Sequence, residues 1–573
     1  MKRTKSTRSV ARWLLVSTLI CGSAVVVTSC GENTLEEILG AVDNPSVPVT
    51  NVTLNKASLK FYANSTESVL LTATVYPDNA TDQSVTWSSS DETKATVDKT
   101  GKVTAVATGT ATITAKAGDK TVTCEVYVYT KKHNINTDGD ADVPAGEFWL
   151  IEGTGESVAK SITIGDGAMI TLDGINITKQ IACSGDATII LADGSENTVD
   201  MTASNVAAGI KVGGIDKTLT IRGEPADDGK LTAKGGSVGA GIGSDFNTSC
   251  GHIVIEGGDI TATGYINGAG IGTGYIFDDG GATIQCGDIT IRGGKVEATG
   301  GGSAAGIGTG NIYSLSGYPH NICGAIIISG GSVKANSNGG AAIGSSNGSS
   351  FRAECGNITI SGGVVEASGS TGIGSGTNGE CGNITISGGV VKASGSSYSY
   401  SGAGIGSGYN GECGNITISG SDTKVTAIGG SHSAGIGCGK VDSYTNNSEC
   451  GNITISGGIV EATGGVCGAG IGTGSAEYGT SLCGAITITS GVTSVTATKG
   501  AYSPNSIGIG YTSNGGTQIC GAITFGTDPV FDGTAATGTW IHDPMVADTY
   551  GGLKLAITTT TNDDDTWTLT PAP

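Results

Sequence analysis

The dipeptide Cys-Gly begins nine similar segments between residues 250 and 520 of this 573-residue chain. The shortest segment reads CGNITISGGVVEASGSTGIGSGTNGE, and the interval between successive copies varies from 26 to 37 residues. A constant pattern at a varying interval indicates a fixed core unit joined by loops of different length. Repeats of this period are typical of solenoids and propellers, in which each unit stacks on its neighbours to bury its apolar face. The copies begin at Cys250, Cys286, Cys323, Cys355, Cys381, Cys413, Cys450, Cys483 and Cys520.

Each full copy contains three short β-forming runs separated by glycine, for example NITISGG, VVEASGS and TGIGSG. Strand alternation predicts that Ile358 and Ile360 point inward while Thr359 points outward. The chain has 99 glycines, and their fixed offsets indicate corners between strands. We therefore predict an all-β chain in which an immunoglobulin-like β-sandwich precedes a parallel β-helix of about eleven coils, with three short strands per coil.

The first 30 residues follow the pattern of an export signal. Five basic residues lie before or at the start of the apolar run WLLVSTLICGSAVVV, which ends in VTSC at Cys30. This segment resembles a bacterial lipoprotein signal, which implies cleavage before Cys30, acylation of its thiol and anchoring in the outer membrane, at the surface of a Gram-negative cell. A transmembrane helix is the alternative, although the run is shorter than the roughly 20 residues that a span needs. The net charge of −21 argues against a nucleic-acid partner.

Residues 49–130 have short alternating strands with turn residues between them, which predicts a β-sandwich. The segment resembles the group 2 bacterial immunoglobulin-like module at Tyr76, Pro77, Trp87 and Gly101 and over 109–115. Alternation places Trp87 in the core, with a ligand platform as the alternative.

The stretch DGDAD, at residues 138–142, has the carboxylate spacing that opens a calcium loop. The expected glycine at the sixth position is Val143, and the twelfth position is Trp149, so the loop is incomplete. We interpret residues 131–145 as a solvated acidic linker and keep calcium binding by Asp138, Asp140 and Asp142 as the alternative. We predict no other metal and no cofactor.

These patterns divide the chain into six parts. They are a signal peptide (1–29), a tether (30–48), the immunoglobulin-like domain (49–130), the acidic linker (131–145), the β-helix (146–525) and a C-terminal cap (526–573).

Stacking the copies in register turns each repeat position into a column of residues along the rod. In the second run, one column contains Glu297, Lys334, Glu366 and Lys392 on consecutive copies, so that no like charges are adjacent. Opposite charges on neighbouring strands fix the register, which makes this column structural. The Cys-Gly column has three open interpretations: a buried thiol ladder, some disulfide-bonded pairs, or a metal site.

An aromatic residue recurs in the variable loop that follows the third run. Loops on one edge of a solenoid often form its binding face, and tyrosine rings suit the C–H faces of sugars. The alternative is that each ring covers its own loop. The candidates are Phe246, Tyr275, Tyr313, Phe351, Tyr409, Tyr444, Tyr478 and Tyr511.

A β-helix enzyme that degrades polysaccharide needs a carboxylate pair, or a base beside calcium, on a face that breaks the repeat. We identify no such cluster in the sequence and predict a protein that is not an enzyme. The repeat resembles glycine-rich AGIG-type repeats of bacterial surface proteins, which implies carbohydrate binding or adhesion. A structural surface protein that binds another protein is the second hypothesis, and a β-helix lyase or hydrolase is the third.

Overall fold

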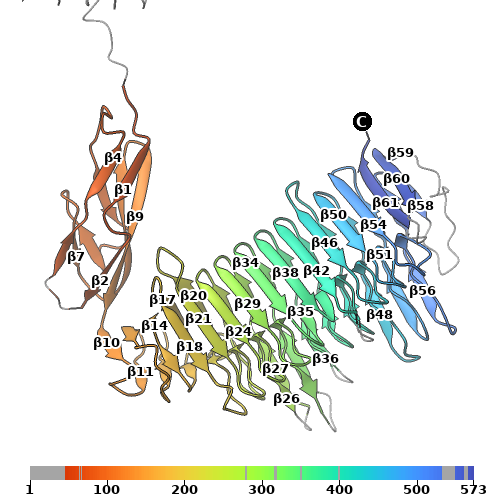
Figure 1. The fold of residues 1–573 in the computed structure, drawn as a ribbon, viewed down its shortest axis with the longest axis horizontal. Helices are drawn as coiled ribbons and strands as arrows, with labels where there is room; N and C mark the ends of the chain where they lie inside the picture. Colours follow the sequence, from red (N-terminus) through yellow and green to blue (C-terminus); the bar gives the residue numbers. More distant parts are fainter. Residues whose placement is uncertain are drawn as a thin grey trace, which may run out of the picture.

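The structure is a computed structural model that describes residues 46–63, 65, 67–277, 281–314, 319–348, 352–397, 401–531, 549–559 and 565–572. Over these residues the chain contains strands and no helix. The described residues therefore include no helix that is long and apolar enough to cross a membrane. A β-sandwich is followed by a parallel β-helix that forms a rod (Figure 1), which confirms the predicted fold class.

The sandwich packs three small sheets around an apolar core. Trp87 is half-buried against this core, and its ring lies so close to Gly101 that a side chain at Gly101 would collide with it. The strands are β1 (Asn51–Leu54), β2 (Ser58–Tyr62), β3 (Ser68–Leu70), β4 (Ala73–Tyr76), β5 (Thr86–Ser89), β6 (Ala95–Val97), β7 (Lys102–Ala105), β8 (Gly109–Ala117) and β9 (Lys120–Tyr129).

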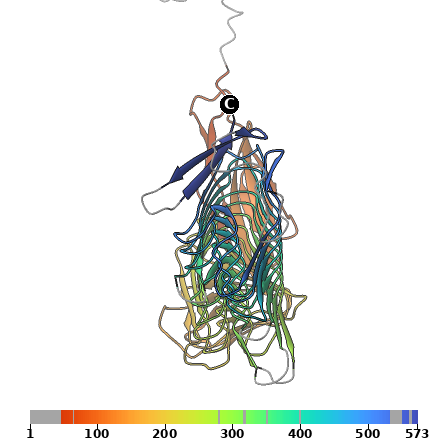
Figure 2. The same ribbon diagram turned by 90° about the vertical axis from the view of Figure 1, so that its right-hand side faces the viewer.

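One coil of the repeat region contains four strands, each in a different sheet that continues along the rod. The coil around Ile358 consists of β36 (Arg352–Cys355), β37 (Ile358–Ile360), β38 (Val364–Gly369) and β39 (Thr371–Gly374). We call the sheet that contains β37 the first sheet, and the sheet that contains β38 the second sheet. The third sheet contains β39, and the fourth sheet contains β36. Figure 2, viewed from one end of the rod, shows the coils lying over one another.

Among the described residues, the first, second and third sheets contain 15, 14 and 13 strands. The second sheet has eleven parallel strands from β15 (Asn176–Ile177) to β54 (Ser494–Thr498), which corresponds to the eleven coils predicted. The first and third sheets begin earlier in the chain, at β10 (Lys131–Asn134) and β11 (Ala141–Val143).

The fourth sheet was not among the three strands predicted for each coil. Its eight described strands run from β27 (Thr283–Cys286) to β56 (Thr517–Cys520), and each ends at a cysteine of the Cys-Gly column. Their sequences vary from TIQC to RAEC to TSLC, and only the cysteine is common to all eight, so the strand pattern is not visible in the sequence.

Identical side chains stack on one another in the core of the rod. Ile358 and Ile360 are fully buried and pair in register with Ile384 and Ile386 of the next coil. The cysteines of the column are also buried and free, and they pair in register from coil to coil, which agrees with the thiol ladder. Such in-register stacking gives each coil an apolar surface that only another coil can cover.

The charge column on the second sheet forms ion pairs between coils, as predicted. The Lys334 ammonium lies 2.8 Å from the Glu297 carboxylate, and that of Lys392 lies 3.5 Å from Glu366. These residues are register partners on adjacent strands, so a slip of one residue would break both contacts.

The interpretation of residues 131–145 as a linker is wrong. Lys131–Asn134 pairs in parallel with β12 (Phe148–Glu152), and Ala141–Val143 pairs with β13 (Ile162–Ile164), so this segment contains strands of the first coil. Ala141 and Val143 are buried on either side of Asp142. This alternation is too short to be recognised beside the acidic residues of DGDAD.

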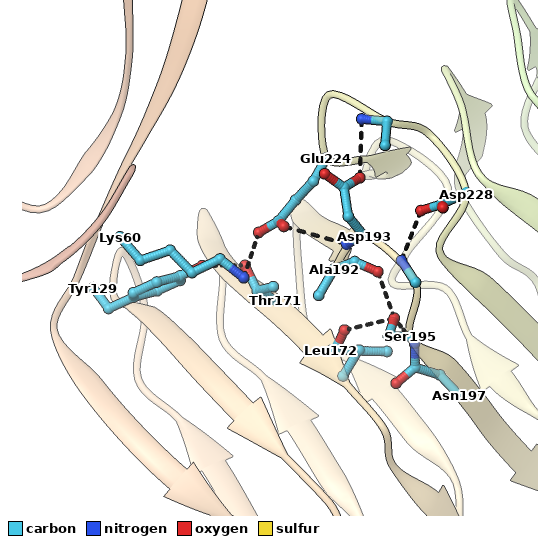
Figure 3. A network of polar contacts seen from close by, with 12 residues as sticks. Lys60, Tyr129, Thr171, Leu172, Ala192, Asp193, Ser195, Asn197, Glu224 and Asp228 are labelled. Carbon is cyan, nitrogen blue, oxygen red and sulfur yellow. Dashed lines mark hydrogen bonds and ion pairs between the residues drawn. The ribbon is translucent and has the colours of Figure 1, made fainter. Parts of the chain in front are cut away.

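The sandwich packs directly against the first coils of the rod. Tyr127, Tyr129, Phe148, Leu150 and Ile190 form a buried cluster across the junction. Polar contacts at the same junction are drawn in Figure 3. There the Lys60 ammonium lies 2.9 Å from the buried Glu224 carboxylate, and the Tyr129 hydroxyl donates a hydrogen bond to Thr171 over 3.1 Å.

The last coils are covered by antiparallel strands. β61 (Asp565–Pro571) pairs with β54 and with β60 (Leu553–Thr559), and β58 (Asp528–Phe531) pairs with β57 (Ile523–Phe525). Trp567 is buried against the end of the core. These strands occupy edges that would otherwise pair with another chain.

Candidate functional site

The variable loops between the third and fourth sheets stack along one side of the rod, which we call the loop edge. Short parallel bridges join Val441 to Ala476 and Ala476 to Thr512 on successive coils, so strand-like pairing continues into the loops. Earlier in the chain, two loop strands also pair in parallel, β26 (Ile276–Phe277) with β31 (Ile312–Tyr313). Loops of different length therefore bring their side chains into contact at this edge.

The aromatic residues of the loop edge form pairs between neighbouring coils. The ring centroids of Tyr444 and Tyr478 lie 4.6 Å apart. Two more pairs, Phe246–Tyr275 and Phe277–Tyr313, are stacked with ring centroids 6.0 Å and 5.9 Å apart. Aromatic rings of neighbouring coils therefore lie next to one another at three places along the loop edge.

The candidate aromatic residues differ in exposure. Tyr444 is 82% exposed, Tyr313 and Tyr511 are also exposed, and Tyr275 and Tyr478 are half-buried. Tyr409 is only 8% exposed and lies beside the Lys440 ammonium, which is 6.0 Å from its ring centroid. Two other predicted site residues, Phe351 and the lipidation candidate Cys30, lie outside the described residues.

Lys440 joins two carboxylates whose residues are close in sequence to Tyr444 and Tyr478. Its ammonium lies 3.0 Å from Asp442 and 3.4 Å from Glu477, and its side chain is only 13% exposed. The amide of Asn514 donates a hydrogen bond to Glu477 over 3.2 Å. The two carboxylates belong to different coils, and each precedes one of the two tyrosines in sequence. The loop edge therefore carries an aromatic pair and charged hydrogen-bonding groups on the same two loops.

Two groups in this cluster have shifted pKa values. Burial and the negative charge of Glu477 raise the pKa of Asp442. Burial and the positive charge of Lys440 lower the pKa of His432, against the opposing effect of Glu477. The Nδ1 atom of His432 is buried and has no hydrogen-bond partner among the described residues. Shifted titratable groups that gather at one place in a repeat are candidates for a functional site.

Four residues of the loop edge, Lys440, Asp442, Glu477 and Phe277, were not predicted from the sequence. The segment CGKVDSY at residues 438–444 carried the signal, because charged residues here replace the small polar residues that follow most GIG runs. Glu477 lies on the next copy, and only stacking brings it to Lys440. Asp442 and Glu477 therefore form a carboxylate pair that breaks the repeat, although no such pair was predicted.

The three aspartates proposed as a calcium site do not converge. Asp138 accepts a hydrogen bond from the backbone N–H of Asn134, and Asp140 accepts one from that of Ser161, each over 2.9 Å. Asp142 lies in β11. Across the described residues, no group of three or more histidine, cysteine or acidic side chains is placed to hold a metal ion.

A column of like charges lies on the fourth sheet. Glu354, Glu380, Glu412 and Glu449 are register partners on successive coils, and the last three line a groove of about 310 Å³. Burial raises the pKa of Glu380, and the charges of Glu412 and Glu354 raise it further, against the opposing effect of Arg352. The Arg352 guanidinium is the cation that pairs with Glu380.

Comparison with family models identifies both parts of the chain. The model of the bacterial Ig-like domain (group 2) matches residues 48–126. The beta helix repeat model matches eight segments between residues 227 and 475, namely 227–246, 253–275, 289–311, 326–347, 358–377, 384–409, 416–440 and 453–475.

Similarity to known proteins is confined to short stretches. The chain is 47% identical over 79 residues to an alpha-L-arabinofuranosidase of Bifidobacterium longum, covering 14% of this chain and 7% of that protein. It is 50% identical over 80 residues to a lacto-N-biosidase of Bifidobacterium bifidum, covering 13% of this chain and 7% of the relative. An Ig-like virion protein of Serratia phage KSP90 is 38% identical over 110 residues, which is 19% of this chain and 42% of the phage protein. The chain therefore spans less than half the length of these relatives.

Proposed function

We propose that this protein is a non-catalytic cell-surface lipoprotein whose β-helix binds carbohydrate at the loop edge. The observation that carries the proposal is the Tyr444–Tyr478 pair on the two loops that also carry the carboxylates of Asp442 and Glu477. Rings provide flat apolar surfaces for the C–H faces of a sugar, and carboxylate and amide groups accept or donate hydrogen bonds to its hydroxyls. The similarity of short stretches of the chain to two glycosidases is compatible with a role among glycans.

A glycan array probed with the purified chain tests this proposal. We expect the wild type to bind a defined set of glycans and the double variant Tyr444→Ala, Tyr478→Ala to lose that binding by roughly tenfold or more, since each lost ring contact is worth about 1 kcal/mol. Tyr502→Ala is the matched control, because Tyr502 is also highly exposed but lies in a loop between the second and third sheets. Absence of binding, or equal loss in the control, would refute the proposal.

The lipid anchor is a separate part of the proposal. The sequence around Cys30 supports it, and the rod would then extend from the membrane behind the immunoglobulin-like domain. Metabolic labelling with a fatty-acid analogue, followed by outer-membrane fractionation, tests this part. We expect Cys30→Ser to abolish labelling, and wild-type protein without label would contradict the anchor.

The carboxylate pair favours a second candidate function, glycoside hydrolysis. Asp442 and Glu477 both contact one ammonium at a position that breaks the repeat, and the raised pKa of Asp442 suits a general acid. The ion pairs with Lys440 favour a binding role over a catalytic one. Incubation of wild-type protein and of Asp442→Asn with pectins and host glycans separates the two functions. Sugar release by the wild type alone would establish hydrolysis.

A further inference from the structure

Cys438 is a cysteine outside the Cys-Gly column that points toward that column from another wall of the rod. It follows Gly437 of β47 (Ile436–Gly437) in the third sheet, and it is fully buried. In seven other coils the residue at this position is a serine or threonine, whose hydroxyl accepts a hydrogen bond from a backbone N–H of the next coil. Examples are Ser375, which accepts from Gly408 over 3.0 Å, and Ser407, which accepts from Gly439 over 3.1 Å.

The Cys438 thiol is surrounded by the cysteine column. Its sulfur donates to the carbonyl oxygen of Leu482 over 3.0 Å, and it interacts with the thiols of Cys450 and Cys483 on two adjacent strands of the fourth sheet. Cys450 in turn lies 3.8 Å from the sulfur of Cys413. The result is a compact group of three thiols, Cys438, Cys450 and Cys483, which we call the thiol triad.

Geometry separates Cys438 from the other cysteines of this group. Cysteines in register on parallel strands are held with their Cβ atoms near the strand spacing of about 4.8 Å, beyond the roughly 3.5–4.5 Å that a disulfide needs. Cys438 approaches from the third sheet, so the strand spacing of the fourth sheet does not fix its distance to Cys450 or Cys483. It can therefore reach a bonding position that the stacked cysteines cannot reach with one another.

We propose that the thiol triad is an oxidation site in which Cys438 forms a disulfide with Cys450 or Cys483. The bond would join the third sheet to the fourth sheet across the interior, two residues before Lys440 of the loop edge. It would hold the start of the loop that carries Asp442 and Tyr444. This proposal rests on the core of the rod and stands whether or not the loop edge binds glycans.

The reaction is thiol–disulfide exchange with a disulfide-containing oxidant, such as oxidised glutathione or a protein disulfide, as the coil closes during folding. The Cys438 thiolate attacks one sulfur of the oxidant, forming a mixed disulfide and releasing one thiolate. The thiolate of Cys450 or Cys483 then attacks the Cys438 sulfur, forming the internal bond and releasing the second thiolate. The two protons lost by the protein thiols go to the two thiolates released, so the oxidant gains the two electrons that the protein gives up.

The pKa values of the three thiols in the triad are shifted by their contacts with one another. Burial raises the pKa of its thiol, but hydrogen bonds from the Cys450 and Cys483 thiols outweigh this effect and lower the pKa overall. The pKa of Cys450 is raised by its contacts with Cys413 and then Cys438, and that of Cys483 is raised by its contact with Cys438. Shifts in opposite directions are those of thiols in mutual contact, which agrees with a compact triad.

Peptide mapping of the full chain tests the proposal. The protein is refolded in a glutathione redox buffer, its free thiols are alkylated under denaturing conditions, and linked peptides are identified by mass spectrometry. We expect one internal disulfide that contains Cys438, and reduction should then lower the melting temperature. Full alkylation of the wild type, or disulfides among the column cysteines alone, would overturn the proposal.

Two variants make the test specific. Cys438→Ser installs the residue that most closely matches other coils, so the rod should fold, which circular dichroism checks, and the linked peptide and the effect of reduction should both disappear. Cys381→Ser removes a column cysteine away from the triad and should keep both. Loss of the disulfide in Cys381→Ser would show that the bond does not belong to the triad and would also overturn the proposal.

Discussion

The ring of Tyr444 lies 4.6 Å from the ring of Tyr478, although the two residues belong to different copies of the repeat. Their loops differ in length and sequence, but each begins from a β-helix corner of fixed position. The stacked corners bring the two rings together, and the same stacking brings Glu477 to within 3.4 Å of Lys440. The regular core thus positions an irregular surface.

Tyr409 and Tyr444 should respond differently to truncation. Tyr409→Ala removes a buried ring beside Lys440 and should lower the free energy of unfolding by roughly 3 kcal/mol. Tyr444→Ala removes an exposed ring and should change it by less than about 0.5 kcal/mol. Thermal unfolding of both variants measures this difference. Equal losses would mean that Tyr444 is part of the packed structure.

Neutralising one glutamate of the fourth-sheet column should stabilise the rod. Glu412 lies between Glu380 and Glu449, so Glu412→Gln removes like-charge repulsion and should raise stability at pH 7 by about 0.5 kcal/mol. Glu366→Gln, which removes the ion pair with Lys392, should leave stability unchanged or lower it slightly. Melting temperatures compare the two, and a loss in both variants would argue against repulsion.

The same column predicts a pH dependence. The pKa of Glu380 is raised in the folded state above its ordinary value of 4.5, so the folded state holds this proton more tightly than the unfolded state. The contribution of Glu380 to stability should therefore increase as the pH falls through the raised pKa towards 4.5. Denaturation of wild type and of Glu380→Gln at several pH values isolates this contribution. An opposite slope in the difference between them would contradict the shift.

Gly374 should not tolerate a side chain. Its φ is 135°, and an added Cβ would overlap the carbonyl oxygen of Gly406 in the next coil. Gly374→Ala should destabilise the rod by roughly 3 kcal/mol, because backbone strain and the clash act together. Gly155→Ala is the control, since Gly155 also has a positive φ of 78° but an added Cβ would meet no atom within 4 Å. Chemical denaturation should show the larger loss for Gly374→Ala.

Lys60 should fix the sandwich to the rod. Lys60→Ala leaves the buried Glu224 carboxylate without its cation, which should cost roughly 2 kcal/mol. Glu224→Gln removes the buried charge together with the ion pair and should cost less. Thermal unfolding ranks the two variants, and limited proteolysis around Thr130 reports any loosening of the junction. If Glu224→Gln is the more damaging change, the ion pair does not stabilise the junction.

The repeat alone predicted most of the fold. The alternation around Thr359 predicted which side chains are buried, and the order of Glu297, Lys334, Glu366 and Lys392 predicted the ion pairs between coils. Both predictions depend only on local period and register, which a sequence shows directly. Residues 131–145 were misassigned because a two-residue alternation around Asp142 is too short to distinguish a strand from a turn.

The candidate site was only partly predictable. The sequence located the aromatic loops because an aromatic residue recurs in all of them except the shortest, but it did not show which rings pair or which are buried. Lys440, Asp442 and Glu477 carry no repeated pattern, and neither does Cys438 beside Cys450 and Cys483.

The sequence by itself determined the coil, its inward-facing residues and the order of charges along the rod, because these depend on spacing within and between copies. Tertiary structure alone decided the contacts of Tyr444 with Tyr478, of Lys440 with Glu477 and of Cys438 with the cysteine column. These contacts join residues of different loops and walls, and their distances are set by how the loops fold over the stacked coils.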